Sequence, residues 1–403
     1  MNGHKKLKLF RNCRLVNSDF KGYEAKSAFI VESGILTWIG PQSRVPKTLK
    51  FQSVTDLKNN LVLPSFIECH THTVFAGSRA DEFELRNNGT SYLEIAAAGG
   101  GIRSTMAKTR KASSKQLAEV AQKRVYQFLK QGVSTLEIKS GYGLDLKNEI
   151  KILKVINGLS GPRIISTFLG AHALPPEFTS HRQYLDYLAT VVLPYVRKKK
   201  LSERVDIFIE NKFFEKPDAE VFLQTAKKLG FQITIHANQL SLSGGAELAL
   251  LIGAKSADHV IHLTDSAVQR FAKSNCVAVL LPAADLYMKC DYPPARQLLD
   301  AGATVALATD FNPGSSPTQD LSLVGLLARL EMKMTLPEVF LAYTLGAAKA
   351  LGIDDQEGSL SIGKKANFIS TACELSDFFY SAGSMPEHLL FIHGNPVNIP
   401  KFG

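Results

Sequence analysis

His70 and His72, two histidines separated by one threonine, are the first residues of this chain that suggest chemistry. They end an apolar stretch, LVLPSFIECHTH, that has the length and composition of a β-strand. Side chains two residues apart on a strand point to the same face, so both imidazole rings can reach one ion. A single His-x-His is short enough to occur by chance, and alone it is weak evidence for a metal site.

Further polar side chains end other strand-like stretches of the chain. They are His172, the segment His236-Ala237-Asn238-Gln239, the pair Asp258-His259 and the pair Thr309-Asp310, while Ser140-Gly141-Tyr142-Gly143 follows one more stretch. Two imidazoles from one strand, a third from another strand and a carboxylate suit Zn2+ or Fe2+, and they leave a coordination position open for water. The combination therefore predicts a metal centre, although His172 or His259 could instead be a hydrogen-bonded core histidine.

Asp310 has the most specific expected role. It closes an apolar strand, where a buried polar group without a partner would be costly. A carboxylate that contacts both a metal ion and its water can accept the water's proton and then pass it to a leaving nitrogen. We therefore expect Asp310 to be a proton acceptor in a hydrolytic reaction.

Between residues 61 and 355 the chain alternates strand-like and helical stretches eight times. The expected strands are LVLPSFIECHTH, VSTLEIKSG, RIISTFLGAHALP, RVDIFIE, QITIHANQ, SADHVIHL, CVAVLLPA and ATVALATDF. The expected helices span residues 115–131, 147–159, 181–200, 217–230, 244–253, 265–274, 294–302 and 318–331. Eight β–α units in series predict an α/β fold, a parallel sheet closed into a (β/α)8 TIM barrel with its working residues at the carboxyl ends of the strands. An open doubly wound sheet is the alternative, but no GxGxxG opens a helix after a strand.

The two ends of the chain have a different texture, with short β-like segments bounded by turn residues. KLKLF, SAFIVESG and ILTWIG lie near the start, and GSLSIGKKANFIS and HLLFIHGNPV lie near the end. We expect residues 1–60 and 356–403 to form one small β-sandwich domain, and residues 61–355 to form the catalytic barrel.

Composition narrows the class of protein. The 403 residues are 45% hydrophobic and 21% charged, as in an ordinary globular chain. Five cysteines without a CxxC spacing indicate a reducing, cytoplasmic setting. The start has no signal-peptide pattern, and no apolar run is long enough for a membrane span.

The net charge of +10 raises the question of an acidic partner. The densest basic run, residues 197–200, ends a helical stretch, where cations are favourable without any ligand. It also lacks the interleaved aromatic residues of single-strand binders. We therefore expect no nucleic-acid and no membrane partner.

Over essentially its whole length the chain resembles the imidazolonepropionase family of the amidohydrolase superfamily. The most telling stretch is PSFIECHTHTVFAGSRADEFELRNNGTSYLEIAAAGGGI, which joins the His-x-His to a long loop that carries Arg79, Tyr92 and the run Gly99-Gly100-Gly101. Further similar segments are EIKSGYGL, AHALP, GGAELA, SADH and ALATDFNPGSS. The His-x-His is common to the superfamily, whereas the Arg79 loop together with SGYGL and TDFNPGSS is much narrower.

The resemblance implies an activity and a set of site residues. The activity is hydrolysis of 4-imidazolone-5-propanoate, a small anionic cyclic amide, to N-formimidoyl-L-glutamate in histidine degradation. One Zn2+ or Fe2+/Fe3+ ion per subunit would be bound by His70, His72, His236 and Asp310. Substrate would be bound by Arg79, Tyr92, Tyr142, His172, Gln239, His259, Asn312, Gly314 and Ser315, and the catalytic residues would be Asp310 and His259. A homodimer is implied as well.

Two details of the resemblance bear on mechanism. Arg79, Tyr92 and Tyr142 would hold the propanoate carboxylate, which suits a guanidinium fork and phenolic donors. Position 239 is Gln where some members have Glu, and a neutral amide can hydrogen-bond the ring but cannot act as a base. Proton transfer then depends on Asp310 and His259. The run Gly99–Gly101 would let its loop close over the site.

Two other functions remain open at this stage. A related aminohydrolase acting on a neutral, nucleobase-like ring could use the same His259 and Asp310. A barrel retained only for binding or assembly would need no tightly bound metal. Arg79 distinguishes the first alternative, because a neutral substrate has no carboxylate for it, and metal content distinguishes the second. The identity of the metal stays open, since three histidines and an aspartate accept zinc and iron alike.

Overall fold

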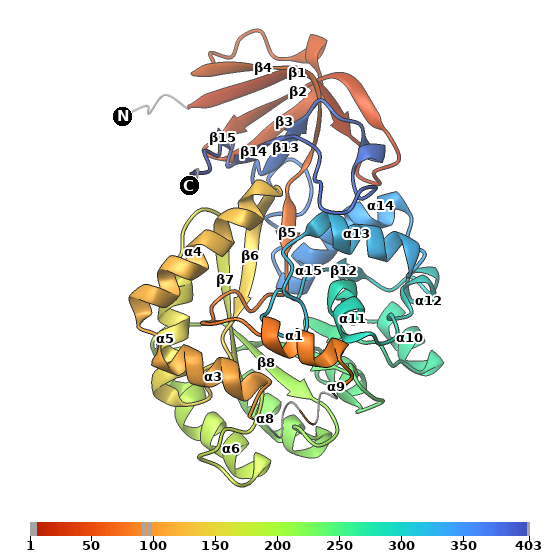
Figure 1. The fold of residues 1–403 in the computed structure, drawn as a ribbon. Coiled ribbons are helices and arrows are strands. Elements are labelled where there is room, and N and C mark those ends of the chain that lie inside the picture. Colours follow the sequence, from red (N-terminus) through yellow and green to blue (C-terminus); the bar gives the residue numbers. More distant parts are fainter. Residues whose placement is uncertain (1–5, 91–93, 95–98, 401–403) are drawn as a thin grey trace.

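The computed structural model describes residues 6–90, 94 and 99–400. It shows a barrel of parallel strands surrounded by helices, and a second, mixed sheet at one end of the barrel that contains strands from both ends of the chain (Figure 1). Among the described residues, no helix has both the length and the apolar content needed to cross a membrane.

The barrel consists of eight strands that pair in the order of the sequence. They are β5 (Phe66–Glu68), β6 (Val133–Lys139), β7 (Arg163–Ala171), β8 (Arg204–Ile209), β9 (Gln232–Ala237), β10 (Ser256–His259), β11 (Val277–Leu280) and β12 (Val305–Leu307). Every neighbouring pair is parallel. The ring closes where Thr71 forms a parallel bridge with Phe311, and the N–H of His72 donates to the Phe311 carbonyl at 2.9 Å. The predicted TIM barrel is confirmed.

Glu68, at the end of β5, strengthens this closing seam. Its Oε1 accepts the backbone N–H of His70 at 3.2 Å and that of Thr309 at 3.2 Å. Burial raises the pKa of this carboxyl to about 8, against the lowering effect of those N–H groups. The first and last strand ends, which carry His70 and Asp310, are thereby held side by side.

Each segment expected to be helical contains a helix. These are α4 (Ser114–Lys130), α5 (Leu146–Asn157), α6 (His181–Tyr187), α7 (Leu193–Lys198), α8 (Lys216–Lys228), α9 (Gly245–Ile252), α10 (Asp265–Ala272), α12 (Ala295–Asp300) and α13 (Leu321–Leu330). A π-helical turn, Leu188–Val192, joins α6 to α7. Further helices are α11 (Pro282–Met288), α14 (Leu336–Leu341) and α15 (Ala347–Leu351), the last two joined by another π-helical turn, Ala342–Gly346.

Helix α4 illustrates why these segments fold locally. Ser113 and Gln116 form a capping box that satisfies free N–H groups at the first turn. Its buried side chains recur at helical spacing and join the main hydrophobic core: Leu117, Ala121, Val125, Phe128 and Leu129. An apolar stripe of this kind makes the segment a helix packed on the barrel.

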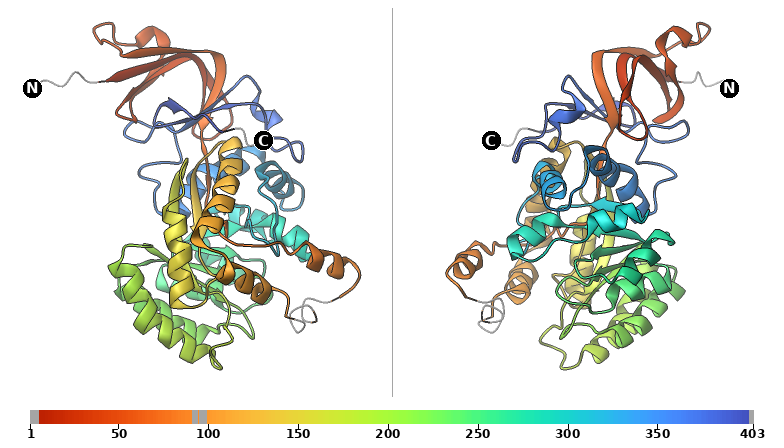
Figure 2. Two further views of the ribbon diagram at one scale, coloured as in Figure 1. Left: turned by 60° about the vertical axis from the view of Figure 1, so that its left-hand side comes forward. Right: turned by 90° about the vertical axis from the view of Figure 1, so that its right-hand side faces the viewer.

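The segment after β5 differs from expectation. It was predicted as a long loop, but it contains α1 (Ala80–Asn87) and α3 (Ile102–Lys111). No residue of α1, which is described throughout, is buried, so the sequence has no apolar stripe there to reveal a helix. Figure 2 shows α1 standing out from the body of the barrel.

The second sheet has seven strands from both ends of the chain. They are β1 (Leu7–Val16), β2 (Tyr23–Glu32), β3 (Ile35–Pro41), β4 (Ser53–Pro64), β13 (Phe368–Thr371), β14 (Leu389–Ile392) and β15 (Asn395–Pro396), in the order β15-β14-β13-β4-β1-β2-β3. Only the β1–β4 pair is parallel among these strands.

This sheet folds over on itself. Phe29 of β2 and Phe368 of β13 are separated by two strands in the sheet, yet their rings meet edge-on at 5.1 Å. Phe10 likewise contacts Phe391 at 5.7 Å. Two parts of one continuous sheet therefore enclose an aromatic core, which gives the sandwich-like packing expected from the sequence. Domain boundaries at residues 60 and 356 stay a prediction, and residue 60 falls inside β4.

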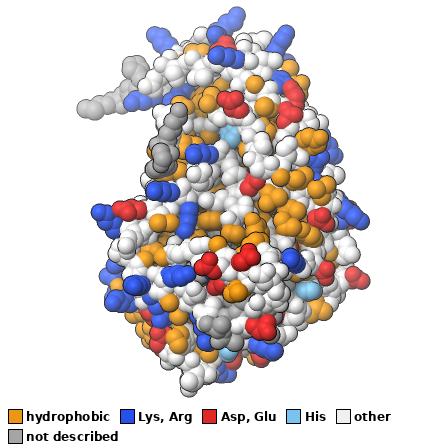
Figure 3. Space-filling view, viewed as in Figure 1, with side chains coloured by type: hydrophobic (Ala, Val, Ile, Leu, Met, Phe, Trp, Pro, Cys, Tyr) orange, Lys and Arg blue, Asp and Glu red, His pale blue; other side chains and the backbone are white. Residues whose placement is uncertain are grey.

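Surface charge is dispersed on the face shown in Figure 3. Lys and Arg side chains lie around the whole outline with Asp and Glu among them, and hydrophobic side chains gather near the middle. A nucleic-acid site would call for basic residues gathered in a patch or stripe. On this face the basic side chains are spread over the surface and do not gather in one patch.

Truncating the aromatic core should destabilise the protein strongly. Phe368 is fully buried between strands from the two chain ends. Phe368→Ala should lower the free energy of unfolding by about 3–5 kcal/mol, measured by denaturant unfolding of the metal-free protein. The control is Leu389→Ala on β14, whose residue is 61% exposed and should change stability by less than about 0.5 kcal/mol. Equal effects of the two changes would contradict this view of the sheet.

Candidate metal centre

The predicted metal ligands meet at the carboxyl ends of the barrel strands. His70 and His72 follow β5, His236 lies in β9, and Asp310 follows β12. Each of the three histidines can offer a ring nitrogen such that the three atoms lie within 4.8 Å of one another, and all three residues are buried. Residues that are 238 positions apart in the chain, such as His72 and Asp310, become neighbours because the barrel closes between β12 and β5.

Distances to Asp310 fit a shared ion. Its Oδ1 lies 3.4 Å from His70 Nε2 and 3.3 Å from His72 Nε2. Ligands about 2.0–2.1 Å from a tetrahedral metal are separated from each other by about 3.3 Å. His70 Nε2 is buried and has no hydrogen-bond partner among the described residues. An unpartnered, buried nitrogen is costly unless something else satisfies it, so these residues fit a metal ion.

Carboxylates lie behind two of the imidazoles. His70 Nδ1 forms a 2.6 Å hydrogen bond with Asp258 Oδ2, and His236 Nδ1 lies 2.9 Å from Asp206 Oδ2. A carboxylate on Nδ1 fixes the tautomer in which Nε2 carries the free lone pair. Both aspartates are fully buried.

At pH 7 two of the proposed ligands have the protonation state that metal binding needs, and one does not. Burial lowers the pKa of His72 to about 4, so this ring is neutral at pH 7. Burial raises the pKa of the Asp310 carboxyl, but the His70 and His72 imidazoles outweigh that effect and hold it well below its usual range. Burial and the Lys139 charge lower the pKa of His70, yet the carboxylates of Asp258 and Asp310 raise it to about 9. His70 must therefore lose a proton when a metal binds.

His259 and His172 lie beside this cluster. The ring of His259 is 5.3 Å from that of His236, and burial lowers its pKa to about 3. His172 stacks on His72 with ring centres 5.3 Å apart, and its Nδ1 lies 3.0 Å from the Gly141 carbonyl. Both histidines are close to the cluster and are not isolated core residues.

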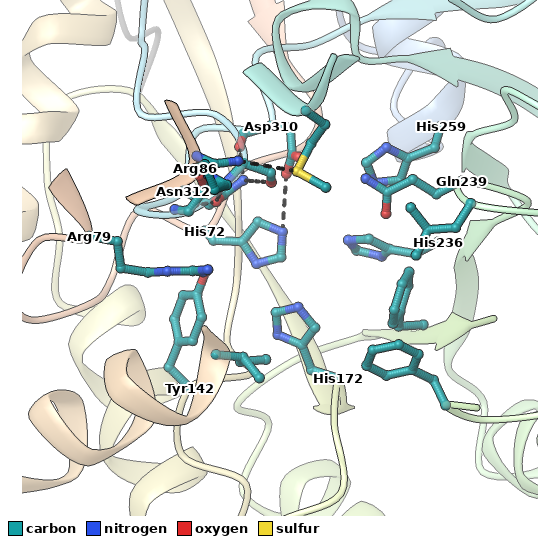
Figure 4. A pocket seen from close by; sticks show the side chains of 17 residues that line it. His72, Arg79, Arg86, Tyr142, His172, His236, Gln239, His259, Asp310 and Asn312 are labelled. Carbon is teal, nitrogen blue, oxygen red and sulfur yellow. Dashed lines mark hydrogen bonds and ion pairs between the residues drawn. The ribbon is translucent and has the colours of Figure 1, made fainter. Parts of the chain in front are cut away.

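A cavity of about 330 Å3 opens in front of the cluster (Figure 4). The predicted site residues that line it are His72, Arg79, Tyr142, His172, His236, Gln239, His259, Asp310, Asn312, Gly314 and Ser315. Apolar side chains complete the wall: Ile102, Phe208, Phe213, Leu240 and Met288. His70 is not among the residues that line the cavity, and Tyr92 lies outside the described residues. A small cavity in which apolar walls and convergent polar groups meet is typical of a small-molecule site.

Arg79 brings a cationic group to this cavity. Its Nε donates to Glu82 Oε2 at 2.8 Å, which orients the guanidinium group and leaves Nη1 and Nη2 for a ligand. Figure 4 shows the Tyr142 hydroxyl pointing toward Arg79. A Cβ added at Gly314 would lie 2.0 Å from Arg79 Nη1, so only glycine leaves room for this guanidinium group.

Buried Glu149 shapes the loop that carries Tyr142. Its Oε1 accepts the N–H groups of Gly143 at 2.7 Å and Leu144 at 2.9 Å, and its carboxylate also accepts that of Gly141. A Cβ at Gly143 would lie 2.5 Å from the Glu149 backbone nitrogen. The glycine spacing of SGYG thus lets the chain wrap around one carboxylate and present the tyrosine to the cavity.

The loop after β12 is organised by Asn312. Its Oδ1 accepts the N–H groups of Gly314 and Ser315, each at 2.8 Å, and its Nδ2 donates to the Asp310 carbonyl at 2.7 Å. The amide is thus engaged within the loop while one side of the residue faces the cavity. Its predicted contact with substrate stays a prediction.

Sequence reasoning missed Arg86, Asp206 and Lys139. Arg86 lines the cavity from α1, and its Nη2 donates to the Gly314 carbonyl at 3.3 Å. Asp206 and Lys139 are charged residues within buried strands β8 and β6. A charge inside an apolar strand is the signal that could have identified the last two, because such residues are rarely buried unless paired.

Known proteins are similar to this chain over most of its length. The amidohydrolase family model matches residues 61–397. Imidazolonepropionase of Bdellovibrio bacteriovorus is 53% identical over 375 residues, which cover 92% of this chain and 89% of that protein. The enzymes of the same name from Acinetobacter baumannii and Shewanella oneidensis are 40% and 42% identical, over 97% and 89% of this chain and 99% and 90% of their own lengths.

Solved structures share the fold at low sequence identity. A zinc-bound adenosine deaminase from Xanthomonas campestris is 17% identical, with a TM-score of 0.74, over 96% of this chain and 92% of that structure. A triazine hydrolase variant is 15% identical, with a TM-score of 0.71, over 97% of this chain and 94% of the other. At this identity the likeness supports the fold alone.

Metal binding should release protons at neutral pH. Because the pKa of His70 is about 9 without metal, we expect the release of about one proton or more per ion at pH 7, and an affinity that rises about tenfold per pH unit up to pH 9. Calorimetric titration with Zn2+ in buffers of different ionisation enthalpy measures the release. Asp258→Asn removes the carboxylate that raises this pKa and should release fewer protons. Binding without proton release in the unchanged protein would contradict the assigned charge of His70.

Proposed function

The chain belongs to the imidazolonepropionase family of the amidohydrolases, and from this we propose that it hydrolyses 4-imidazolone-5-propanoate to N-formimidoyl-L-glutamate. Water is added across the ring bond between the carbonyl carbon and nitrogen. The carbonyl carbon becomes a carboxylate, and the nitrogen leaves with a proton. The observation that best supports this substrate is a guanidinium group, Arg79, in the same cavity as the three-histidine cluster.

We propose that His70, His72, His236 and Asp310 bind one Zn2+ or iron ion per chain. When bound, such an ion lowers the pKa of its water toward ~7 and polarises the carbonyl of a substrate. Nitrogen ligands with one carboxylate suit either metal. The buried position of these side chains keeps bulk water away from the reacting bond.

Asp310 is the proposed proton acceptor. It is ionised at neutral pH, and its Oδ1 lies beside both His70 and His72. From this position the carboxylate can take a proton from the attacking water and deliver it to the leaving ring nitrogen. His259, whose low pKa keeps the ring neutral, can donate an N–H to the carbonyl oxygen as charge develops there.

The rest of the cavity is proposed to hold the substrate. Arg79 and the Tyr142 hydroxyl take the propanoate carboxylate, Arg79 as a two-pronged donor. Tyr92 would add a second phenol there. His172 and Gln239 face the imidazolone ring, and the Gln239 amide binds without exchanging a proton. Asn312, Gly314 and Ser315 complete the wall, with Gly314 leaving space for Arg79.

The cellular setting and assembly form part of the same proposal. All five cysteines lie in the described part of the chain and none forms a disulfide, which supports a reducing, cytoplasmic setting. A homodimer is proposed from family membership, and sedimentation analysis of the purified protein tests it.

The activity is tested directly with freshly generated imidazolone propanoate. Protein loaded with Zn2+ or Fe2+ should open the ring, and the loss of ring absorbance and the appearance of N-formimidoyl-L-glutamate report the reaction. Protein that contains one ion per chain and turns over no substrate would refute the proposal. Metal-stripped protein is the control, and its activity should return when the ion is added back.

Removing Arg79 should distinguish an anionic from a neutral substrate. Arg79→Ala should lower kcat/KM for imidazolone propanoate by ~100-fold or more, since charge-assisted hydrogen bonds to the carboxylate are lost. An analogue with methyl in place of the propanoate arm should be hydrolysed by both proteins at rates within about threefold. Arg182→Ala, which removes a mostly exposed arginine on α6, is the matched control. Unchanged activity of Arg79→Ala on imidazolone propanoate would favour the neutral-ring hydrolase, and equal losses on both substrates would contradict the assigned role of Arg79.

Gly314→Ala tests the position of Arg79 without changing Arg79 itself. The added methyl would displace the end of a flexible side chain and no backbone, so the fold should be retained while Arg79 moves. We expect a ~10–100-fold loss in kcat/KM, mainly through KM, with unchanged thermal stability. In the control Gly158→Ala, the added Cβ meets only ordinary contacts at 3.5 Å. An unchanged KM would contradict the assigned position of Arg79.

A further inference from the structure

Lys139 is a buried lysine in the centre of the barrel. It ends β6, its side chain is 1% exposed, and it is not among the residues that line the cavity. Lysine is almost never fully buried unless it is paired, because desolvating the ammonium group is costly. Its ammonium group must therefore be paired with other buried polar groups.

Three carboxylates surround its ammonium group. Nζ donates to Glu137 Oε1 at 3.0 Å, lies 3.0 Å from Asp206 Oδ2, and lies 3.8 Å from Asp258 Oδ2. The three acids come from three strands, β6, β8 and β10, and each side chain is at most 1% exposed. One ammonium group, that of Lys139, thus contacts carboxylates from all three strands.

Two of the three carboxylates are the ones behind proposed metal ligands. Asp258 is hydrogen-bonded to His70 Nδ1 at 2.6 Å, and Asp206 lies 2.9 Å from His236 Nδ1. Asp206 Oδ1 also accepts the backbone N–H of His236 at 3.2 Å, so this aspartate orients both the main chain and the ring. The third, Glu137, accepts the backbone N–H of Thr71, which stands between His70 and His72.

Buried acids that lie this close together need a counter-charge, because a carboxylate loses solvation in a protein interior. The Lys139 ammonium group provides one positive charge, 3.0 Å from Asp206 Oδ2 and 3.8 Å from Asp258 Oδ2. A carboxylate held in this way can accept the Nδ1 proton of the imidazole in front of it.

We propose that Lys139 is a positioning residue for the metal centre: its ammonium group clamps Asp206 and Asp258 so that His236 and His70 present Nε2 to the ion. It acts through these two aspartates and touches neither the ion nor the substrate. The proposal rests on the proposed metal site but does not depend on which substrate the enzyme opens. Loss of such supporting groups typically lowers metal affinity by 10–100-fold.

The test measures metal affinity on variants that keep the buried charge balanced. Lys139→Met alone leaves three buried carboxylates without their cation and can fail to fold, so it is paired with Glu137→Gln in a double variant. The double variant removes one positive and one negative charge together. Competition of the purified, metal-free proteins with a chromophoric chelator gives the Zn2+ dissociation constant, and circular dichroism and thermal unfolding report the fold.

Two single variants serve as controls. Glu137→Gln removes the charge of one partner of Lys139 but keeps an amide oxygen that can accept the Thr71 N–H. Because this side chain touches no ligand ring, the change should alter the Zn2+ dissociation constant by less than about threefold. Lys365→Met removes another lysine paired with a buried carboxylate, Glu357 at 2.8 Å, away from the proposed ligands. It should lower stability without weakening Zn2+ binding.

We expect the double variant to be folded and to bind Zn2+ 10–100-fold more weakly, with activity restored by excess Zn2+ at an unchanged KM. A folded double variant that binds Zn2+ within threefold of the unchanged protein would overturn the proposal. A double variant that cannot fold would also overturn it, because a residue that only positions ligands can be removed without losing the barrel. If the unchanged protein binds Zn2+ but opens no imidazolone, the proposed function fails while the Lys139 proposal is still decided by the dissociation constants.

Discussion

An imidazole ring that binds a metal with one nitrogen is oriented, and held in one tautomer, by a partner on the other nitrogen, and in a protein interior that partner must itself be satisfied. This constraint organises the centre of the barrel. His70 is held by Asp258 and His236 is approached by Asp206, and these acids share the ammonium group of Lys139. Because each group is buried, removing one leaves the next without its partner. All of these side chains are buried in the barrel.

The groups proposed for the reaction and the main groups proposed to bind the substrate carboxylate lie on different parts of the barrel. The groups proposed for metal binding and proton transfer sit in or directly after strands, whose positions are fixed by the hydrogen bonds of the closed sheet. The groups proposed to recognise the substrate sit on longer loops, with Arg79 at the start of α1 and Gly314 in the loop after β12. Loops tolerate change better than strands, so specificity can vary around an unchanged centre.

Several residues next to the proposed metal site have strained backbone conformations. His259 has φ of 74° and Asp310 has φ of 51°, in the left-handed region that side chains other than glycine rarely adopt. Asn238, beside His236, has φ of 52°. Such conformations persist only where neighbouring contacts compensate for them. Asn312 donates to the Asp310 carbonyl, and the Asn238 amide bridges the His262 carbonyl and the Ala246 N–H. Amide side chains next to the strained residues thereby stabilise the turns that aim His259 and Asp310 at the cavity.

Local patterns in the sequence were sufficient for the order of strands and helices, the TIM barrel and the polar residues at strand ends, because period and composition act over a few residues. The family resemblance also predicted Arg79 and Tyr142 as site residues, and both line the cavity. The sequence did not predict helix α1, since that helix buries no residue and so has no apolar stripe. It also did not predict that Lys139, Asp206 and Asp258 meet, nor that Gly314 makes room for Arg79. Those contacts join residues from separate strands and loops, and only the register and closure of the folded barrel decide which of them lie within a hydrogen bond of one another.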